Sequence, residues 1–294
     1  MKRIPMLAVS TLLAVGGVCG AQQFTPEMIN TTLPEEGAPK AVPGPYAVVG
    51  EGASGTAGLK TFRPESLDAF PKRDTLPVLV WGNGGCAIEN ARYAGFLTTV
   101  ASHGFLVITT TGSPPAEGAP RRQATAEDLK AAIDWAVQEN GRAGSPLKGK
   151  IDTKHVAVMG QSCGGVLSIR LGADPRVGTI GVFNSGLLEP DALQALHGPV
   201  LLVNGAERDF MAERSRATFD AIQNLPAFYG ARHGAGHTAT AYHVGGGEFA
   251  NVATNWVLWQ FKKDKSAARM FAGADCQLCT NSTWDVAAKG LAKP

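Results

Sequence analysis

Short, mainly apolar runs recur along the chain and are separated by turns and by longer amphipathic stretches. A run that is apolar at successive positions is typical of a strand buried on both faces, as in a parallel sheet, because a strand with one exposed face would alternate with polar residues. Glycines end the first of these runs. We therefore expect buried strands at 77–81, 105–108, 155–159, 177–183, 200–203 and 227–229, with earlier strands within 46–62.

Helical spacing fills several of the intervals between these runs. Thr125 and Asp128 resemble a capping box, which satisfies free N–H groups in a first helical turn. Apolar residues follow them at helical spacing, namely Leu129, Ala132, Ile133, Ala136 and Val137. We expect helices over 125–140, 91–103 and 249–261. Strands that alternate with helices form βαβ units, so the pattern predicts an α/β fold with a mostly parallel central sheet and helices on both faces.

The first 21 residues have the pattern of a secretory signal peptide. Lys2 and Arg3 precede a largely apolar stretch over 4–18, which is too short to span a bilayer, and small residues follow it. We expect cleavage before Gln22. A lipid-modified Cys19 is the alternative, which the bulky residue before it disfavours. The protein would then be secreted or periplasmic, with a signal peptide at 1–21.

The rest of the chain divides into an arm and one domain. Residues 22–45 are rich in Pro, Glu and Gly and predict an N-terminal arm, whereas 46–294 shows no repeat or linker and predicts a single domain. The 27 Lys and Arg residues nearly balance the 25 Asp and Glu residues, and there is no basic run. This balance gives no electrostatic reason to expect a nucleic acid or an anionic membrane as a partner. No further apolar run reaches the roughly 18 residues of a membrane span.

The segment 160–165 reads GQSCGG and lies between a predicted strand and a helical stretch at 166–171. G-x-S-x-G in this setting is typical of a nucleophile elbow, in which small neighbours let a serine project from a very tight turn. The N–H groups of the following helix lie where negative charge develops on a substrate. The segment predicts Ser162 as a nucleophile, and a chance Gly-Ser-Gly turn is the alternative.

A nucleophilic serine needs a histidine base that a carboxylate orients. After such an elbow the acid precedes the histidine along the chain. Asp209, in the loop after the strand at 200–203, is our choice for the acid, with Glu207 as the alternative. His237, after the last predicted strand, is our choice for the base. His233 is the main alternative, and His243 is expected to be a surface group.

Two backbone N–H groups should form an oxyanion hole for the carbonyl oxygen of the substrate. The residue after the nucleophile supplies one of them, which predicts Cys163. The glycine-rich loop after the strand at 77–81 would supply the other, with Asn83 as the first choice and Gly84 as the second. A flexible turn is the alternative reading of this loop. It is no phosphate loop, because no Gly-Lys-Ser/Thr follows it.

Four segments together, 81–86, 160–165, 205–209 and 234–237, resemble the α/β-hydrolase superfamily. Within it the chain is similar to exported, lidless esterases of the dienelactone hydrolase, chlorophyllase-like and bacterial cutinase (polyester hydrolase) type. The resemblance implies no cap domain, Ser162, Asp209 and His237 as catalytic residues, and Asn83 with Cys163 as oxyanion donors. The chain departs from polyester hydrolases at Gln161, where those enzymes usually carry an aromatic residue or histidine, and in the short loop between Cys276 and Cys279.

These residues predict a carboxylic-ester hydrolase that works through an acyl-enzyme, without a metal or an organic cofactor. The substrate would be a small-molecule or polymeric ester. A peptidase or an acyltransferase could use the same three side chains, and a non-catalytic binding protein on a hydrolase fold is the alternative from another class.

Four cysteines remain once the signal peptide is removed: Cys86, Cys163, Cys276 and Cys279. An even number in an exported protein suggests disulfides. Cys86 and Cys163 would lie on loops that face each other across the reacting carbonyl, so they could pair, and Cys276 could pair with Cys279 across a short loop. In the alternative, Cys163 is a small buried residue and Cys86 is free. A zinc site is disfavoured because the pair at 276 and 279 has no second pair at ligand spacing.

Overall fold

The computed structural model describes residues 32–112 and 122–292, so the predicted signal peptide lies outside the described residues. The strands in the described part are β1 (Val48–Gly52), β2 (Leu59–Pro64), β3 (Leu76–Gly82), β4 (Leu106–Thr110), β5 (Ile151–Gln161), β6 (Val177–Phe183), β7 (Val200–Gly205), β8 (Ala227–Arg232) and β9 (Trp284–Lys289). The helices are α2 (Ala94–Ala101), α3 (Ala126–Gly141), α4 (Cys163–Leu171), α5 (Pro190–Gln194), α6 (Ala212–Ala221), α7 (Gly247–Lys262) and α8 (Lys265–Ala268). Short 3₁₀ turns are η1 (Gly84–Cys86), η2 (Ala91–Tyr93) and η3 (Val244–Gly246).

All six predicted buried strands are present, as β3 to β8. The described sheet has the strand order β1-β2-β4-β3-β5-β6-β7-β8-β9. Neighbouring strands from β4 to β8 pair in parallel, whereas the pairs β1–β2, β2–β4 and β8–β9 are antiparallel. Parallel strands end at the same edge of a sheet, so the loops that follow β3, β5, β6, β7 and β8 gather there.

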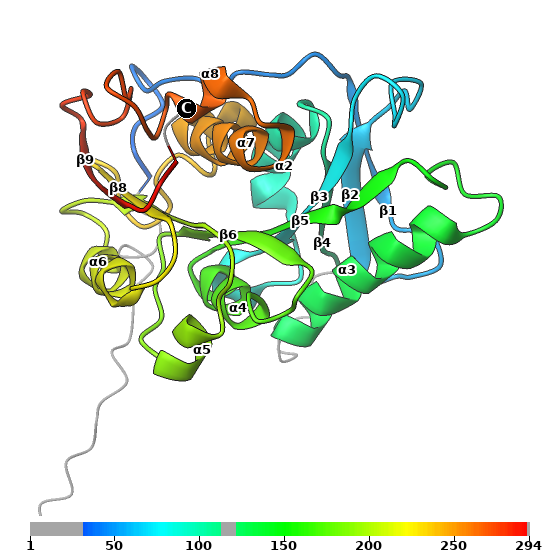
Figure 1. Cartoon of the computed structure of the whole chain (residues 1–294), viewed down its shortest axis with the longest axis horizontal. Helices are drawn as coiled ribbons and strands as arrows, with labels where there is room; N and C mark the ends of the chain where they lie inside the picture. Colours follow the sequence, from blue (N-terminus) through cyan, green and yellow to red (C-terminus); the bar gives the residue numbers. More distant parts are fainter. Residues whose placement is uncertain (1–31, 113–121, 293–294) are drawn as a thin grey trace, which may run out of the picture.

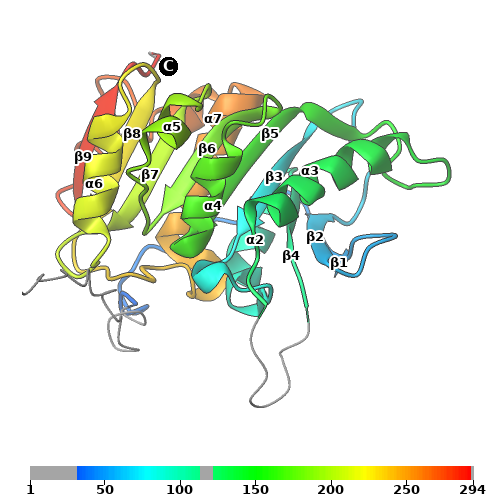
Figure 2. The same cartoon turned by 90° about the horizontal axis from the view of Figure 1, so that it is seen from below.

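Helices cover both faces of the sheet, as predicted. The helices α2, α7 and α8 lie on one face, and α3 to α6 lie on the other (Figures 1 and 2). Strand β3 contributes to both layers. Val78 and Val80 belong to the core that includes α3 and α4, whereas Leu79 and Trp81 belong to the core that includes α2 and α7. All four side chains are fully buried, and this explains why the strand is apolar at every one of these positions.

The predicted capping box is present at the start of α3. The Thr125 hydroxyl accepts a hydrogen bond from the Asp128 N–H, and the Asp128 carboxylate accepts one from the Thr125 N–H. Four of the five predicted apolar positions are buried, but Val137 is 44% exposed, so its assignment to the buried face was wrong. At 100° per residue, Val137 lies at the margin of the stripe that faces the sheet.

The connection between β6 and β7 is short, as the implied absence of a cap domain requires. Residues 184–199 hold one helix, α5, and no multi-helix cap. No helix among the described residues is both long enough and apolar enough to cross a bilayer.

The C-terminal segment forms a strand that the sequence pattern did not reveal. Strand β9 pairs antiparallel with β8 at the edge of the sheet. Its first residue, Trp284, is buried, and the indole N–H donates to Glu248 Oε1 at 2.8 Å. Glu248 in turn pairs with Arg232 at the end of β8, at 2.8 Å. The segment therefore joins the last parallel strand to helix α7.

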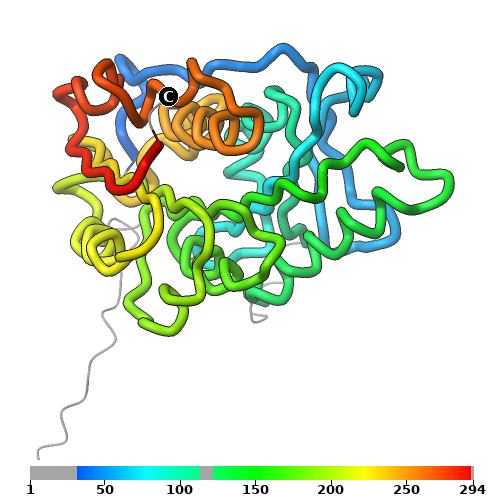
Figure 3. Tube along the Cα trace, in the orientation of Figure 1, coloured from blue at the N-terminus to red at the C-terminus, as the bar shows by residue number. Residues whose placement is uncertain are grey.

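The described part of the N-terminal arm, from residue 32, runs beside η3 and α7 (Figure 3). The Leu33 N–H donates to the Ala239 carbonyl at 3.0 Å, and His243 Nε2 lies 2.6 Å from the Leu33 carbonyl oxygen. Asn251 of α7 binds backbone groups of the arm at 40 and 42. His243 is only 9% exposed, so our expectation of a surface histidine was wrong: the arm covers it.

Candidate active site

Ser162 occupies a sharp turn between β5 and α4. Its backbone has φ 53° and ψ −121°, a conformation that is strained for any residue with a side chain. The turn is held on both sides, because the Ser162 N–H donates to the Phe183 carbonyl and the Ser185 hydroxyl donates to the Ser162 carbonyl. A side chain at Gly160 or at Gly164 would collide with backbone atoms, so the G-x-S-x-G glycines are required by close packing.

The structure brings Ser162, His237 and Asp209 together. His237 Nε2 lies 2.8 Å from Ser162 Oγ, and His237 Nδ1 lies 2.9 Å from Asp209 Oδ1. An ionised carboxylate only accepts hydrogen bonds, so Nδ1 carries the proton that it donates to Asp209, and Nε2 accepts from the Ser162 hydroxyl. His237 and Asp209 are 2% and 4% exposed, which shields both from water. This arrangement can move a proton from the serine to the imidazole.

Asp209 is fixed by donors besides His237. Its carboxylate accepts hydrogen bonds from Asn184 Nδ2 at 2.8 Å, from the Met211 N–H at 3.0 Å and from the Gly205 N–H at 3.2 Å. Asn184 follows β6, is fully buried and has a positive φ of 47°. Our sequence analysis did not single it out. An asparagine directly after a predicted parallel strand was the available signal.

The two residues held as alternatives pair with each other rather than with Ser162. His233 Nδ1 lies 3.3 Å from Glu207 Oε2, and Glu207 Oε1 also accepts from the Gly234 N–H. The side chains of His233 and Glu207 are 44% and 58% exposed. Glu207 and Asp285 raise the pKa of His233. Backbone hydrogen bonds, from its own N–H and that of Gly234, lower the pKa of Glu207.

The glycine-rich loop after β3 faces the nucleophile turn. The buried Asn83 side chain donates to the Ala87 carbonyl at 3.0 Å, and this contact fixes the fold of the loop. Gly84, our second choice for the oxyanion hole, donates its N–H to the Tyr93 hydroxyl at 3.0 Å. That bond engages the Gly84 N–H and leaves Asn83 as the better choice. Cys163 begins α4, directly after Ser162.

Two disulfides connect the four cysteines in the predicted pairs. Cys86 is bonded to Cys163, with their Cα atoms 5.1 Å apart, and Cys276 is bonded to Cys279. The first bond joins the loop after β3 to the first residue of α4. It therefore ties together the two loops that carry Asn83 and Cys163.

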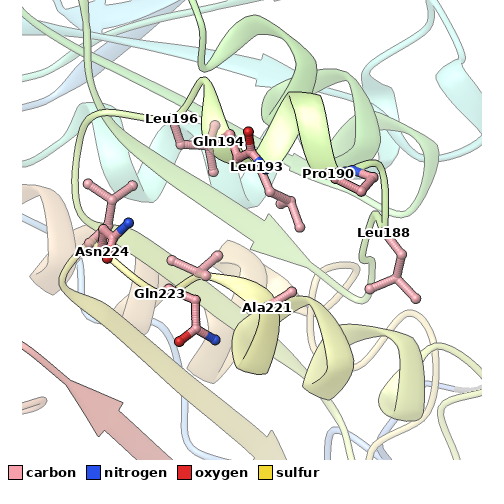
Figure 4. A pocket seen from close by; sticks show the side chains of 10 residues that line it. Leu188, Pro190, Leu193, Gln194, Leu196, Ala221, Gln223 and Asn224 are labelled. Atoms are coloured by element: carbon pink, nitrogen blue, oxygen red, sulfur yellow. The ribbon is translucent and has the colours of Figure 1, made fainter.

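Two hollows of equal size differ in their relation to this site. One, of ≈ 520 Å³, lies beside the loop after β3 and is lined by residues that include Gly84, Gly85, Arg92, Tyr93, Arg122 and Tyr242. The other, also ≈ 520 Å³, lies between α5 and the end of α6 (Figure 4). Neither hollow is lined by the five predicted site residues, but Gly84 in the first directly follows Asn83. We therefore take the first as the candidate substrate pocket. Among the residues of 32–112 and 122–292, no group of three or more metal-ligating side chains is placed to hold a metal ion.

A mostly parallel sheet with a serine elbow after β5, an acid after β7 and a histidine after β8 defines the α/β-hydrolase fold. A model of the PET hydrolase-like family matches residues 34–282. The chain therefore belongs to the PET hydrolase-like family, and the predicted α/β-hydrolase fold is confirmed.

Three bacterial cutinases are similar to part of the chain. Cutinase 2 of Thermobifida cellulosilytica is 30% identical over 133 residues, which is 44% of this chain and 46% of that protein. Cutinase cut1 of Thermobifida fusca and a cutinase of Thermobifida fusca strain YX are each 30% identical over the same length, which is 38% of either protein. The chain thus spans less than half the length of the curated relatives it matches.

Proposed function

We propose that the protein is a serine carboxylic-ester hydrolase, with Ser162 as nucleophile, His237 as general base and acid, and Asp209 as the group that orients the imidazole. The observation that carries this proposal is the continuous hydrogen-bonded path from Ser162 Oγ through His237 to Asp209. The path starts on a strained strand–turn–helix elbow in a chain of the PET hydrolase-like family.

In the proposed reaction, Ser162 Oγ attacks the ester carbonyl carbon while His237 Nε2 takes the hydroxyl proton. The negative charge moves to the carbonyl oxygen, which the N–H groups of Cys163 and Asn83 stabilise. Collapse of this intermediate breaks the bond to the alcohol, which leaves with the proton from His237. Water then attacks the acyl-enzyme by the same steps, and the acid is released.

The comparisons support a substrate class. The named relatives are cutinases, so we propose small or polymeric carboxylic esters as substrates. The disulfides and the predicted signal peptide support a secreted or periplasmic enzyme.

The test is a panel of esters graded by acyl length and aromaticity, with matched amides, measured on the wild-type protein and on Ser162→Ala. Replacing the nucleophile should lower kcat/KM by at least about 10⁴-fold while the circular dichroism spectrum is unchanged. Ser66→Ala, which truncates an exposed serine, is the control. A serine-directed phosphonate should label Ser162 alone.

Three results would contradict the proposal. Substantial activity in Ser162→Ala would show that Ser162 is not the nucleophile. Faster turnover of amides than of matched esters would favour a peptidase. A wild-type protein that neither hydrolyses esters nor reacts with the phosphonate would favour a binding protein.

A further inference from the structure

We propose that Tyr93 and Gln161 are positioning residues that hold the oxyanion loop, residues 83–87, in a fixed position relative to the backbone of His237. This inference rests on the proposed function. Neither residue belongs to the catalytic set described above, although Gln161 directly precedes Ser162.

The two side chains form a buried relay of three hydrogen bonds. The Gly84 N–H donates to Tyr93 Oη at 3.0 Å, the Tyr93 hydroxyl donates to Gln161 Oε1 at 2.8 Å, and Gln161 Nε2 donates to the His237 carbonyl at 2.8 Å. Tyr93 is 3% exposed and Gln161 is 2% exposed. Hydrogen bonds shielded from water in this way restrict motion more strongly than exposed ones do.

The backbone groups at both ends fix the direction of the relay. The His237 carbonyl can only accept a hydrogen bond, so Gln161 must present its amide NH₂ to it and its Oε1 to Tyr93. Tyr93 must then donate its hydroxyl proton to Oε1, and a lone pair on Oη accepts from the Gly84 N–H. Burial raises the pKa of Tyr93 well above its ordinary value, so the phenol keeps the proton that the relay requires.

Each end of the relay adjoins a group with a proposed role in the reaction. Gly84 follows Asn83, an oxyanion donor, Gln161 precedes Ser162, and His237 is the base. None of the relay bonds involves the imidazole or the serine hydroxyl, so its two side chains act through the backbone. An error of about 1 Å in such positions can lower a rate about 10²-fold.

The packing around Gly84 leaves no room for a side chain at this position unless the relay side chains move. A Cβ atom at this position would collide with Gln161 Oε1 and with Tyr93 Oη. The Tyr93 ring also packs against Trp81, with their ring centroids 5.4 Å apart, at the end of the strand that leads into the loop. Gly84→Ala therefore breaks the relay by displacement, while both relay side chains remain in the protein.

The decisive experiment compares Tyr93→Phe, Gln161→Met and the double variant in ester hydrolysis. Each single variant should lower kcat about 10- to 100-fold, because the catalytic groups lose their alignment. KM of Gln161→Met should stay within about threefold, since Gln161 does not line the candidate substrate pocket, whereas Tyr93 does. The rate of phosphonate labelling of Ser162 should fall in parallel. The double variant should lose little more than either single variant, because both changes break the same relay.

Two further variants separate positioning from general destabilisation. Tyr46→Phe removes the hydroxyl of another tyrosine, which donates to Asp74 at 2.9 Å. Both residues are distant in sequence from the site, so this variant should keep the wild-type kcat. Gly84→Ala should reproduce the loss of kcat. Tyr93→Phe should lower the melting temperature more than Tyr46→Phe, because it leaves the Gly84 N–H and Gln161 Oε1 without their partner, so the kinetics are recorded well below both melting temperatures.

The inference is overturned if Tyr93→Phe and Gln161→Met turn over esters at the wild-type rate. It is also overturned if their losses of kcat multiply in the double variant, or if Tyr46→Phe loses as much kcat as Tyr93→Phe. These outcomes presuppose an active wild-type enzyme that is labelled on Ser162. A wild-type protein without ester hydrolysis or labelling would instead overturn the proposed function.

Discussion

Two carboxylate–imidazole pairs lie side by side on the loops after β7 and β8, and their surroundings differ sharply. Asp209 and His237 are buried, and three further donors besides the imidazole hold the carboxylate. Glu207 and His233 lie a few residues away on the same loops, with 58% and 44% of their side chains exposed. Both pairs have the residue types that acid–base chemistry needs. Only the buried pair reaches Ser162.

The difference is one of environment rather than of residue type. An exposed ion pair typically contributes about 0–1 kcal/mol of stability, because water and salt screen it. A buried hydrogen-bonded pair is stronger electrostatically and is held in one geometry. We therefore expect chemistry from the first pair and a small effect on stability from the second.

The largest expected effect comes from replacing each of the two histidines in turn and comparing the two variants. His237→Ala should lower kcat/KM for an ester by about 10⁴-fold or more, because the base is lost. His233→Ala should stay within about threefold of the wild type, since an exposed rim residue contributes little to catalysis. Steady-state kinetics on purified, folded variants provide the measurement. A large loss of activity in His233→Ala, with activity kept in His237→Ala, would show that His233 is the base.

The acids give a second, somewhat smaller contrast. Asp209→Asn should lower kcat by about 10³- to 10⁴-fold, because the imidazole loses the partner that fixes its tautomer. Glu207→Gln should have little effect on kcat. Both replacements keep the size of the side chain, so melting temperatures recorded alongside the kinetics will show that the folds are comparable. Equal losses in the two variants would mean that burial does not distinguish the pairs.

Asn184→Ala sharpens the comparison further. It removes one donor to Asp209 and leaves part of that carboxylate unsatisfied in a buried site, which typically costs about 1–3 kcal/mol of stability. Activity should fall by about 5- to 30-fold, because Asp209 can then rotate away from His237. Asn255→Ala, which removes an amide bonded to a backbone carbonyl within α7, is the control. A wild-type rate in Asn184→Ala would show that the other donors suffice.

The smallest effect is the pH dependence of the exposed pair. Because the pKa of His233 is raised above its ordinary 6.5, its contribution to stability is complete below that value and is lost as the pH rises through the folded pKa. Because the pKa of Glu207 is lowered below its ordinary 4.5, its contribution is present above that value and is lost in more acidic solution.

The difference in melting temperature between the wild type and His233→Gln should therefore be greatest between pH 4.5 and 6.5 and should shrink as the pH rises through the folded pKa of His233, which lies above 6.5. Thermal denaturation across this pH range measures it. A difference that grows steadily with pH would contradict the assignment, because it would require a lowered pKa for His233.

The nucleophile turn and the parallel strands could be predicted from sequence because close packing restricts which residues can stand there. Gly160 and Gly164 face backbone atoms, and the strands from β3 to β8 are covered on both sides. Such constraints operate between neighbours in the chain or at every position of a strand, so they leave a local pattern.

The supporting side chains left no local pattern. Tyr93 meets Gln161 across 68 residues, and Asn184 meets Asp209 across 25. Their hydrogen bonds depend on how the loops converge at the edge of the sheet, which no short segment encodes. Strand β9 was missed because an edge strand in contact with one neighbour carries polar residues among apolar ones. The burial of His243 depends on an arm more than 200 residues earlier.

That arm also has a consequence for the order in which the molecule assembles during synthesis. The contacts of the arm with Asn251 and with His243 join positions 209 to 211 residues apart. At about 5–20 residues per second, roughly 10 to 40 s pass between the translation of the arm and that of its partners. The elbow at Ser162 is complete well before then. The arm can hold the segment that carries His237 only once these partners have been translated, so we expect a nascent chain to remain inert until most of it has been translated.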